Sequence, residues 1–243
     1  MGKRLDFCAE MWYTIIKNGM GTREQRTGKG EERAMCGRYT TDIETDEAEL
    51  FRMLARAETN IPLASAAQKT PRVLGREVFP SEYAAVLAQN GTGGGVDAFL
   101  YRWGYPAEIN GKKRLLINAR SETAAEKALY AESLVSRRCV VLTAGFFEWM
   151  HNGKKADPKL KYRFNMTKTG ILYLAGLYRI SPTTGEYEFV ILTRDANESM
   201  APIHDRMPVI LRPEHVDEYL GDTNSAAKLL CETPPILIKK LVS

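Results

Sequence analysis

The sequence has few of the residues that build disulfide frameworks or metal sites. Its 243 residues include four cysteines, Cys8, Cys36, Cys139 and Cys231, and three histidines. The cysteines are scattered, form no CxxC pair and have no close histidine partner of the kind that a structural zinc site requires. We therefore expect neither a disulfide framework nor a metal site, and no cofactor is indicated.

Long hydrophobic runs are also missing. No stretch of about 18 apolar residues is present, which is the length that a membrane-spanning helix needs. Residues 1–34 lack the apolar core and small-residue cleavage site of a secretory signal. These absences predict a cytoplasmic protein that has no membrane partner.

The charge is nearly balanced. Lys and Arg total 34 against 30 Asp and Glu, which gives a net charge of +4 and a pI of about 8.8. This balance permits binding to nucleic acid without requiring it. A composition of 44% hydrophobic and 26% charged residues is ordinary for one globular domain with its own core.

Local patterns predict an α+β single domain built mostly from antiparallel strands, and we expect a monomer. Residues 18–34 contain no Val, Leu, Ile or aromatic residue and predict a flexible leader. Helical spacing and propensity predict four helices: Asp46–Arg56, Ser121–Val135, Pro213–Leu220 and Ser225–Leu230. Runs rich in β-branched and aromatic residues predict six strands: Tyr83–Ala88, Asp97–Trp103, Arg138–Trp149, Lys161–Met166, Ile171–Arg179 and Tyr187–Thr193.

The glycine-rich segment Asn90–Gly95 has two interpretations. It is typical of a hairpin loop, although its glycines could cradle a phosphate. Because it lacks the Lys-Ser/Thr ending of a P-loop and opens no predicted helix, we favour a plain turn.

Reactive or cationic side chains combine with small or turn-forming neighbours in four segments: Met35–Tyr39, Ile117–Thr123, Gly145–Trp149 and Ile203–Pro208. Glu148 ends an apolar run, where a carboxylate is either ion-paired or has a raised pKa suited to acid-base catalysis. His204 lies in a loop beside charged residues, which favours a site over a structural role. Asn118 and Arg120 precede a predicted helix and suit an oxyanion or a phosphate, or else a helix cap with a solvated arginine.

Taken together, the four segments resemble those of the SOS-response-associated peptidase family in amino-acid sequence and in order, over roughly residues 35–212. The resemblance also takes in Trp103-Gly104, Arg137-Arg138-Cys139 and Ala175-Gly176-Leu177. It implies a mixed fold with a β-barrel-like core, flanking helices and a positively charged channel for single-stranded DNA. It further implies that the cysteine after the initiator methionine bonds covalently to the aldehyde of an abasic site.

Residue by residue, the resemblance assigns the catalytic positions to Cys36, Asn118, Glu148 and His204. It assigns contacts with DNA phosphates or bases to Arg38, Trp103, Arg120 and Trp149, and we expect Arg206 to contact a phosphate as well. Core packing is the alternative for both tryptophans and is the more expected of Trp149. The family assignment also implies a role in the DNA damage (SOS) response, at the nucleoid or replication fork of a bacterium.

This chemistry suits an N-terminal cysteine. Its α-amine can form an imine with the aldehyde, and its thiol can then close a five-membered thiazolidine, a ring unavailable to an internal cysteine. An α-amine titrates at about 7.7–8.0, so a useful fraction is neutral near pH 7. Glu148 is the candidate proton donor for loss of water, His204 could assist sugar ring opening, and Asn118 could orient the amine. An AP lyase activity could accompany the imine.

The sequence departs from the family pattern at two places. Residues 1–35 precede Cys36, and we expect residues 1–34 to be a leader absent from the mature protein, with residues 35–243 forming the domain. Translation from Met35 is favoured, because Lys29–Arg33 can be encoded by purine-rich codons like a ribosome-binding site, and self-cleavage before Cys36 is the alternative. Glu77–Pro80 stands where many members have an Asn-containing segment that ends in Ala-Pro.

Two other functions fit the same residues. A thiol-dependent (auto)peptidase would use Cys36 as nucleophile, His204 as base and Glu148 as the orienting acid. A non-catalytic module that binds single-stranded DNA or a modified base would use the arginines and tryptophans alone.

Overall fold

The computed structural model describes residues 37–42, 52–53, 56–57, 75–91, 95–150, 160–166 and 170–242. Cys36 and the expected leader, residues 1–34, lie outside this set. Of the expected helix Asp46–Arg56, residues 52, 53 and 56 are described, and they are helical. Within the described residues, no helix is long and apolar enough to cross a membrane.

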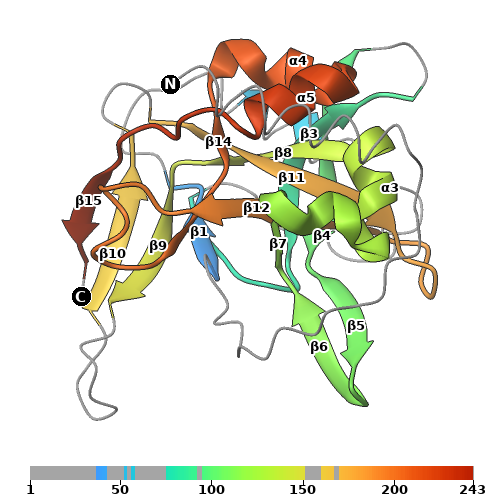
Figure 1. The fold of residues 1–243 in the computed structure, drawn as a ribbon, viewed down its shortest axis with the longest axis horizontal. Coiled ribbons are helices and arrows are strands. Elements are labelled where there is room, and N and C mark those ends of the chain that lie inside the picture. Colours follow the sequence, from blue (N-terminus) through green and yellow to red (C-terminus); the bar gives the residue numbers. More distant parts are fainter. Residues whose placement is uncertain are drawn as a thin grey trace.

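Five strands close into a ring that forms the centre of the molecule (Figure 1). In ring order, β12 pairs with β4, then β3, β8 and β11, and β11 pairs again with β12. Every pair is antiparallel except β12 with β4, which is parallel. This ring confirms the expected barrel-like core. Its strands are β3 (Tyr83–Gln89), β4 (Val96–Trp103), β8 (Arg138–Thr143), β11 (Leu172–Ile180) and β12 (Tyr187–Asp195).

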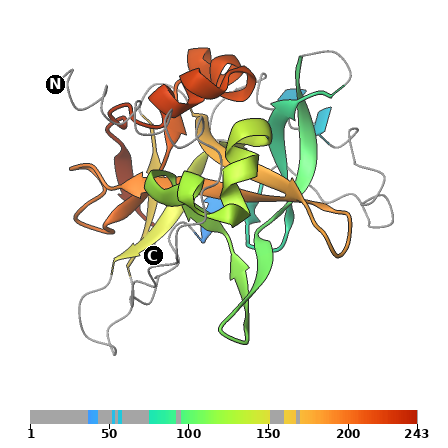
Figure 2. The same cartoon turned by 45° about the vertical axis from the view of Figure 1, so that its right-hand side comes forward.

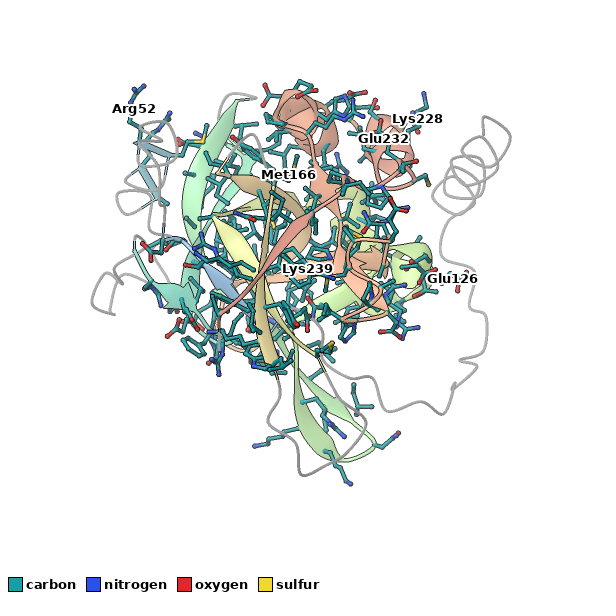
Figure 3. All side chains as sticks on the ribbon, turned by 90° about the vertical axis from the view of Figure 1, so that its left-hand side faces the viewer. Arg52, Glu126, Met166, Lys228, Glu232 and Lys239 are labelled. Carbon is teal, nitrogen blue, oxygen red and sulfur yellow. The ribbon has the colours of Figure 1, made fainter. Side chains whose placement is uncertain are left out.

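A second sheet of five short strands packs against the ring. Its order is β15, β10, β9, β1 and β2, and all its pairings are antiparallel. The buried rings of Tyr39, Phe146 and Phe164 join the same core cluster as Val86 and Val141 of the ring. Side chains therefore fill the space between the two layers (Figure 3). The strands are β1 (Arg38–Thr40), β2 (Glu77–Val78), β9 (Gly145–Met150), β10 (Leu160–Asn165) and β15 (Ile238–Leu241).

Helices cover another side of the ring (Figures 1 and 2). They are α3 (Ala128–Ser136), α4 (Val216–Gly221) and α5 (Thr223–Leu229), with two 3-10 turns, η2 (Ser121–Glu126) and η3 (Pro213–His215). Tyr130, Leu134 and Tyr219 from these helices share a second apolar cluster with ring residues such as Leu87 and Val190. Alternate residues of each ring strand thus enter different clusters, as the two-residue period of a β-strand requires.

The remaining strands form a separate hairpin or pair with strands of the ring. β5 (Tyr105–Ile109) and β6 (Lys112–Leu116) form a separate hairpin that projects from the body (Figure 1). β7 (Asn118–Arg120) and β13 (Arg206–Pro208) flank β12, and β14 (Ile210–Leu211) pairs with β11.

Two of the expected elements are interrupted in the structure. The single strand predicted over Arg138–Trp149 is two strands in two sheets, because the chain turns at Gly145 with φ +156°. A Cβ at Gly145 would lie 2.8 Å from the carbonyl oxygen of Phe164, so only glycine fits this corner. The helix predicted over Ser121–Val135 is interrupted at Lys127, which is extended with φ −97° and ψ 116°. The hairpin predicted at Asn90–Gly95 is confirmed, with β3 and β4 antiparallel and Asn90 N–H donating to the Gly95 carbonyl at 2.7 Å.

Candidate functional site

The four segments singled out in the sequence meet around one buried apolar cluster. Each segment contributes at least one residue to it: Tyr39, Ile117, Phe146, Ile203 and Met207. These elements are distant in the sequence, and the two-layer architecture brings them together. The polar residues next to them in the chain therefore lie at the border of one cluster, which joins the ring to the second sheet.

The start of β1 lies beside Glu148. Arg38 is opposite Phe147 in the antiparallel register of β1 and β9, so the chain before Arg38 runs toward position 148. The other end of β1 is fixed by Thr40, whose carbonyl accepts hydrogen bonds from the Thr143 hydroxyl at 2.7 Å and the Ala144 N–H at 2.8 Å. Gly37, which directly follows Cys36 in the sequence, is next to Arg38 at this end of the strand.

The Glu148 side chain is almost fully buried, with 4% of its surface exposed. Alternation along β9 puts it on the same face as Phe146, toward the shared cluster and away from Phe147 and Trp149. Its Oε2 accepts a hydrogen bond from the Trp149 N–H at 3.3 Å. A carboxyl group in this position is shielded from water and can exchange a proton with a group at the start of β1.

Asn118 and Arg120 lie on β7, which runs parallel to β12. Asn118 is opposite Ile191 and Arg120 is opposite Thr193, so both point to the face of β12 that faces the shared cluster at Ile191. Asn118 is half-buried and Arg120 is exposed. The 3-10 helix η2 begins directly after Arg120, in place of the expected α-helix.

Trp103 is a core residue that links β1 to β7. None of its surface is exposed, and its ring packs 5.1 Å from that of Tyr39 and 6.2 Å from that of Phe189. Its indole N–H donates to the Ile117 carbonyl at 3.0 Å, next to Asn118. In this structure Trp103 has no face for a base, whereas Trp149 is half-buried. We expected core packing of Trp149 more than of Trp103, whereas Trp103 is the buried core residue and Trp149 keeps exposed surface.

His204 ends a turn next to the shared cluster, and 10% of its side chain is exposed. Its Nδ1 accepts a hydrogen bond from the Arg206 N–H at 3.0 Å and lies 2.9 Å from a carboxylate oxygen of Asp205. In the neutral ring the first contact leaves the proton on Nε2, because Nδ1 is the acceptor. The imidazole is therefore oriented for proton transfer through Nε2.

Arg206 clamps two of the four segments together. Its guanidinium donates to both carboxylate oxygens of Glu122, at 2.9 and 2.8 Å, to Asp195 and to the Thr193 carbonyl at 2.9 Å. Only 11% of the side chain is exposed. The geometry supports a structural role for Arg206, because two carboxylates already balance its charge, and a phosphate contact would have to displace one of them.

A patch of cations and aromatic rings lies on the outer face of the second sheet. The Arg38 guanidinium is 4.5 Å from the ring centroid of Phe79 and 5.1 Å from that of Trp149. Glu77 lies 3.6 Å from Arg38 and 2.5 Å from the Lys161 ammonium. We call Arg38, Glu77, Phe79, Trp149 and Lys161 the outer patch. Our prediction included Arg38 and Trp149 but missed Lys161. The sequence held a usable signal, because alternate residues of two predicted strands, 161 and 163 in one and 147 and 149 in the other, are cationic or aromatic.

Two cysteines, Cys139 and Cys231, are among the described residues. Cys139 is a free thiol that is fully buried, and burial raises its pKa, so it is a poor nucleophile. Cys231 is disulfide-bonded, contrary to our expectation of no disulfide. Among the described residues, no group of His, Cys, Asp and Glu side chains is arranged to hold a metal ion.

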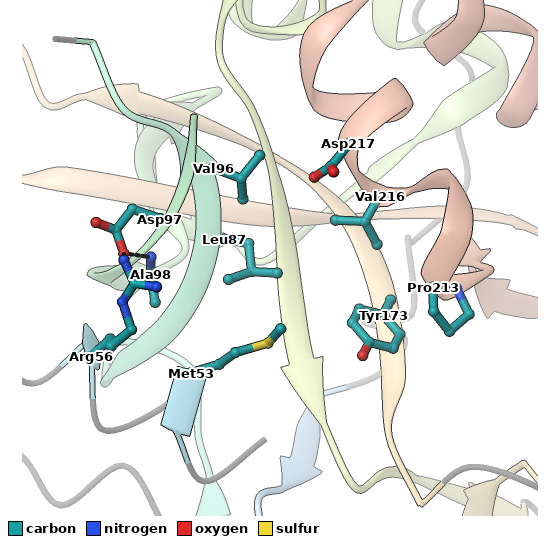
Figure 4. Close-up of a pocket in the computed structure, with 10 residues that line it drawn as sticks. All are labelled: Met53, Arg56, Leu87, Val96, Asp97, Ala98, Tyr173, Pro213, Val216 and Asp217. Atoms are coloured by element: carbon teal, nitrogen blue, oxygen red, sulfur yellow. Dashed lines mark hydrogen bonds and ion pairs between the residues drawn. The ribbon is translucent and has the colours of Figure 1, made fainter. Parts of the chain in front are cut away.

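A hollow of about 330 Å³ lies on another part of the surface, between the ring and the start of α4 (Figure 4). An ion pair of 3.0 Å between Arg56 and Asp97 borders it, and Asp217 lines its far side. None of its lining residues belongs to the four segments. The candidate site is therefore separate from this hollow.

Comparison with known proteins gives consistent results. A profile of the SOS response associated peptidase (SRAP) family matches residues 35–238. The abasic site processing protein YoaM of Bacillus subtilis is 38% identical over 120 residues, which cover 47% of this chain and 51% of that protein. The corresponding protein YedK of Escherichia coli is 30% identical over 189 residues, covering 76% and 79%. The chain thus spans about half the length of the first of these relatives.

The fold also has a solved counterpart. A crystal structure of a Bacteroides thetaiotaomicron protein superposes with a TM-score of 0.63 at 21% identity, over 86% of this chain and 92% of that one. The family profile covers all four segments that meet around the shared cluster. The chain belongs to the SOS response associated peptidase family.

Proposed function

We propose that this protein captures abasic sites in single-stranded DNA by forming a covalent bond through Cys36. The observation that carries the proposal is the position of β1. Its first residues lie beside the buried carboxyl of Glu148, where the segments bearing Asn118 and His204 also converge. Relatives of this family are named abasic site processing proteins, which supports the same substrate.

The proposed reaction proceeds in two bond-forming steps. The neutral α-amine of Cys36 adds to the C1′ aldehyde of the open sugar, and the resulting carbinolamine loses water to give an imine. The Cys36 thiol then adds to the imine carbon, its proton passes to the nitrogen, and a thiazolidine closes. No oxidant or metal is needed, because the only molecule released is water.

Three side chains have roles in these steps. Glu148 donates the proton that lets hydroxide leave the carbinolamine as water, and its burial keeps bulk water from competing. His204 carries a proton on Nε2 for opening of the sugar ring, since its Nδ1 accepts from Arg206. Asn118 orients the amine from β7. Elimination from the imine would give an AP lyase activity, and the thiazolidine step competes with it.

DNA binding in this proposal relies on the exposed cations and the accessible tryptophan. Arg38 and Arg120 contact phosphates, and Trp149 stacks on an unpaired base. Trp103 and Arg206 instead position Ile117 and Glu122, which flank the Asn118–Arg120 strand. Binding is expected to weaken strongly with salt.

The reaction requires a chain that begins at Cys36. Within a longer chain the nitrogen of Cys36 is an amide and cannot form the imine. We therefore propose that the active form starts at Cys36 after removal of Met35, and that it acts on damaged DNA in the SOS response. Since Cys139 is free, the disulfide of Cys231 involves Cys8 or Cys36, so the active form must carry Cys36 and Cys231 as thiols.

Denaturing gel electrophoresis tests the proposal. The protein that starts at Met35 is incubated with a single-stranded oligonucleotide carrying one abasic site, beside the full 243-residue chain. We expect a heat-stable crosslink from the shorter protein alone. Cys36→Ser is the matched control, because it keeps the amine but not the thiol: borohydride should trap its imine, whereas no stable product should form without reduction.

Other outcomes separate the alternatives. Equal crosslinking by Cys36→Ala and the unsubstituted protein would refute the role of Cys36. Binding without any crosslink, with the N-terminal cysteine verified by mass spectrometry, would favour a binding module. Cleavage of the full chain before Cys36, blocked by His204→Ala, would support the autopeptidase.

A further inference from the structure

The hairpin of β5 and β6, which we call the arm, is a regular two-stranded ribbon. Its register runs from Tyr105 opposite Leu116 to Ile109 opposite Lys112. Asn110 and Gly111 form the turn, with φ +52° and +71°. Two positive φ angles are the mark of a type I′ turn, whose twist matches that of the paired strands. The arm is thus a defined element, and all three overall views show it projecting from the body (Figures 1, 2 and 3).

The base of the arm is firmly attached. Gly104 has φ +108°, and a Cβ there would lie 2.8 Å from the Leu115 side chain, so the absence of a side chain allows Leu115 to pack at the base. The Arg179 guanidinium lies 4.3 Å from the ring centroid of the buried Tyr105 and donates to the Pro106 carbonyl at 3.0 Å. Its other contact is the buried carboxylate of Glu188 at 2.9 Å. The arm therefore holds a fixed direction at its base.

One face of the arm is cationic. Lys112, Lys113 and Arg114 are consecutive and exposed. Lys112 is opposite Ile109 and Arg114 is opposite Ala107, whereas Lys113 is opposite the carboxylate of Glu108 on the other face. Lys112 and Arg114 thus share a face on which no acidic residue lies across the hairpin. Ile109 on the same face is 45% exposed.

The arm leads directly into the candidate site. After β6 ends at Leu116, only Ile117 separates it from Asn118 and Arg120 of β7. The Ile117 carbonyl is held by Trp103, so the junction is fixed. From Lys112 to Asn118 the chain spans at most about 20 Å, at roughly 3.3 Å per residue. A stacked strand of DNA advances about 3.4 Å per nucleotide, so this length corresponds to about six nucleotides.

We propose that the arm is a second DNA-binding surface, on which Lys112 and Arg114 bind phosphates of the strand that extends from the reacting sugar. The inference rests on the proposed function, because the strand it binds is the one held at the site. It adds a contact outside the four segments, and it sets the length of DNA that the protein recognises. DNA too short to reach the arm binds without it.

A charge-matched pair of double variants tests this proposal. Lys112→Gln with Arg114→Gln removes two cations from the arm. Arg212→Gln with Lys228→Gln removes two exposed cations elsewhere, and Lys228 lies at the helical end of the molecule, away from the arm (Figure 3). Fluorescence anisotropy measures binding to single strands of about five and about 20 nucleotides that carry a central, unreactive abasic analogue, over a range of salt concentrations. Thermal melting verifies that both variants are folded.

Each phosphate contact contributes about 0.7 to the slope of log affinity against log salt for single strands. The arm variant should therefore lose about 1.4 from this slope on the longer strand and nothing on the shorter one. The control variant should match the unsubstituted protein on both strands. Equal slopes for the arm and control variants on the longer strand would overturn the inference.

The covalent assay separates this inference from the proposed function. If the unsubstituted protein binds DNA but forms no crosslink with a true abasic site, the proposed chemistry fails and the slopes still decide the role of the arm. If it crosslinks but the arm variant keeps its full slope, only the arm inference fails. If it binds no DNA, both fail.

Discussion

Replacing Trp149 by alanine should weaken DNA binding and leave the fold largely intact. Trp149 is half-buried, and its ring contacts are Arg38 at 5.1 Å and Lys161 at 5.9 Å. Stacking of one base on an aromatic side chain contributes about 1–3 kcal/mol. At about 1.4 kcal/mol per tenfold change, the dissociation constant should rise about 5- to 150-fold. Cation–π contacts near the surface contribute about 0.5–1 kcal/mol each, so the free energy of unfolding should fall by less than about 2 kcal/mol.

Trp103→Phe should show the opposite pattern. The smaller ring removes the indole donor from the Ile117 carbonyl and leaves space between Tyr39 and Phe189. Loss of the hydrogen bond costs about 1 kcal/mol, and loss of buried ring atoms adds about 1–2 kcal/mol. At about 2–4 °C per kcal/mol for a domain of this size, the melting temperature should fall by about 4–12 °C. DNA affinity of the folded protein should change less than about twofold.

The assays are thermal melting and fluorescence anisotropy with an unreactive abasic analogue, performed well below the melting temperature of either variant. The two variants should separate completely, one in affinity and one in stability. Weaker DNA binding by Trp103→Phe than by Trp149→Ala, with both proteins folded, would refute the assignment of the two tryptophans.

Three further predictions concern charge and burial. Glu77→Gln should tighten binding of intact single-stranded DNA and steepen its salt dependence. Glu77 lies 3.6 Å from Arg38 and 2.5 Å from Lys161, so it competes with phosphate for these two cations. An unchanged slope of log affinity against log salt would contradict this. Arg138→Met should lower the free energy of unfolding by about 3–4 kcal/mol, because the buried guanidinium donates to four backbone carbonyls, those of Leu134, Val135, Tyr219 and Leu220. Denaturant unfolding measures this loss. The exposed Arg212, replaced by methionine, is the control. Burial raises the pKa of Tyr101, Tyr105, Tyr178 and Tyr219, so the stability that their neutral forms contribute is complete below about pH 10, where unfolded tyrosines titrate, and is lost as the pH rises further. Absorbance at alkaline pH should show these four ionising together with unfolding, and their titration in a still-folded protein would refute the argument.

Sequence patterns predicted the strands of the ring, and the family resemblance implied its barrel-like closure and a site shared by the four segments. Strands such as β3, β11 and β12 combine an apolar composition with turn residues at both ends, and that pattern is local. β1, β2, β13 and β14 have two or three residues each and depend on partners far away in the sequence. Local propensity is too weak to define strands of that length.

The two breaks in expected elements have tertiary causes. The run before Gly145 continues as β-rich sequence after it, and only the close approach of the Phe164 carbonyl explains why the chain changes sheets there. The arm illustrates a local signal that our prediction did not use, because Asn110-Gly111 between two extended runs is typical of a two-residue hairpin. The break at Lys127 has no comparable signal in the sequence.

Tertiary structure separates two kinds of polar or aromatic residue within the family segments. Arg206 and Trp103 form contacts inside the protein: one joins Glu122 to β13, and the other joins Tyr39 to the Ile117 carbonyl. Arg38, Arg120 and Trp149 keep accessible surface. A sequence resemblance cannot make this distinction, because an arginine with a structural role and an arginine that binds phosphate are the same residue type. Burial supplies the distinction, and it follows that loss of Arg206 should lower stability and activity together. It should reduce the salt slope by no more than about 0.7, which is the contribution of one phosphate contact by Arg120 on the strand that Arg206 positions.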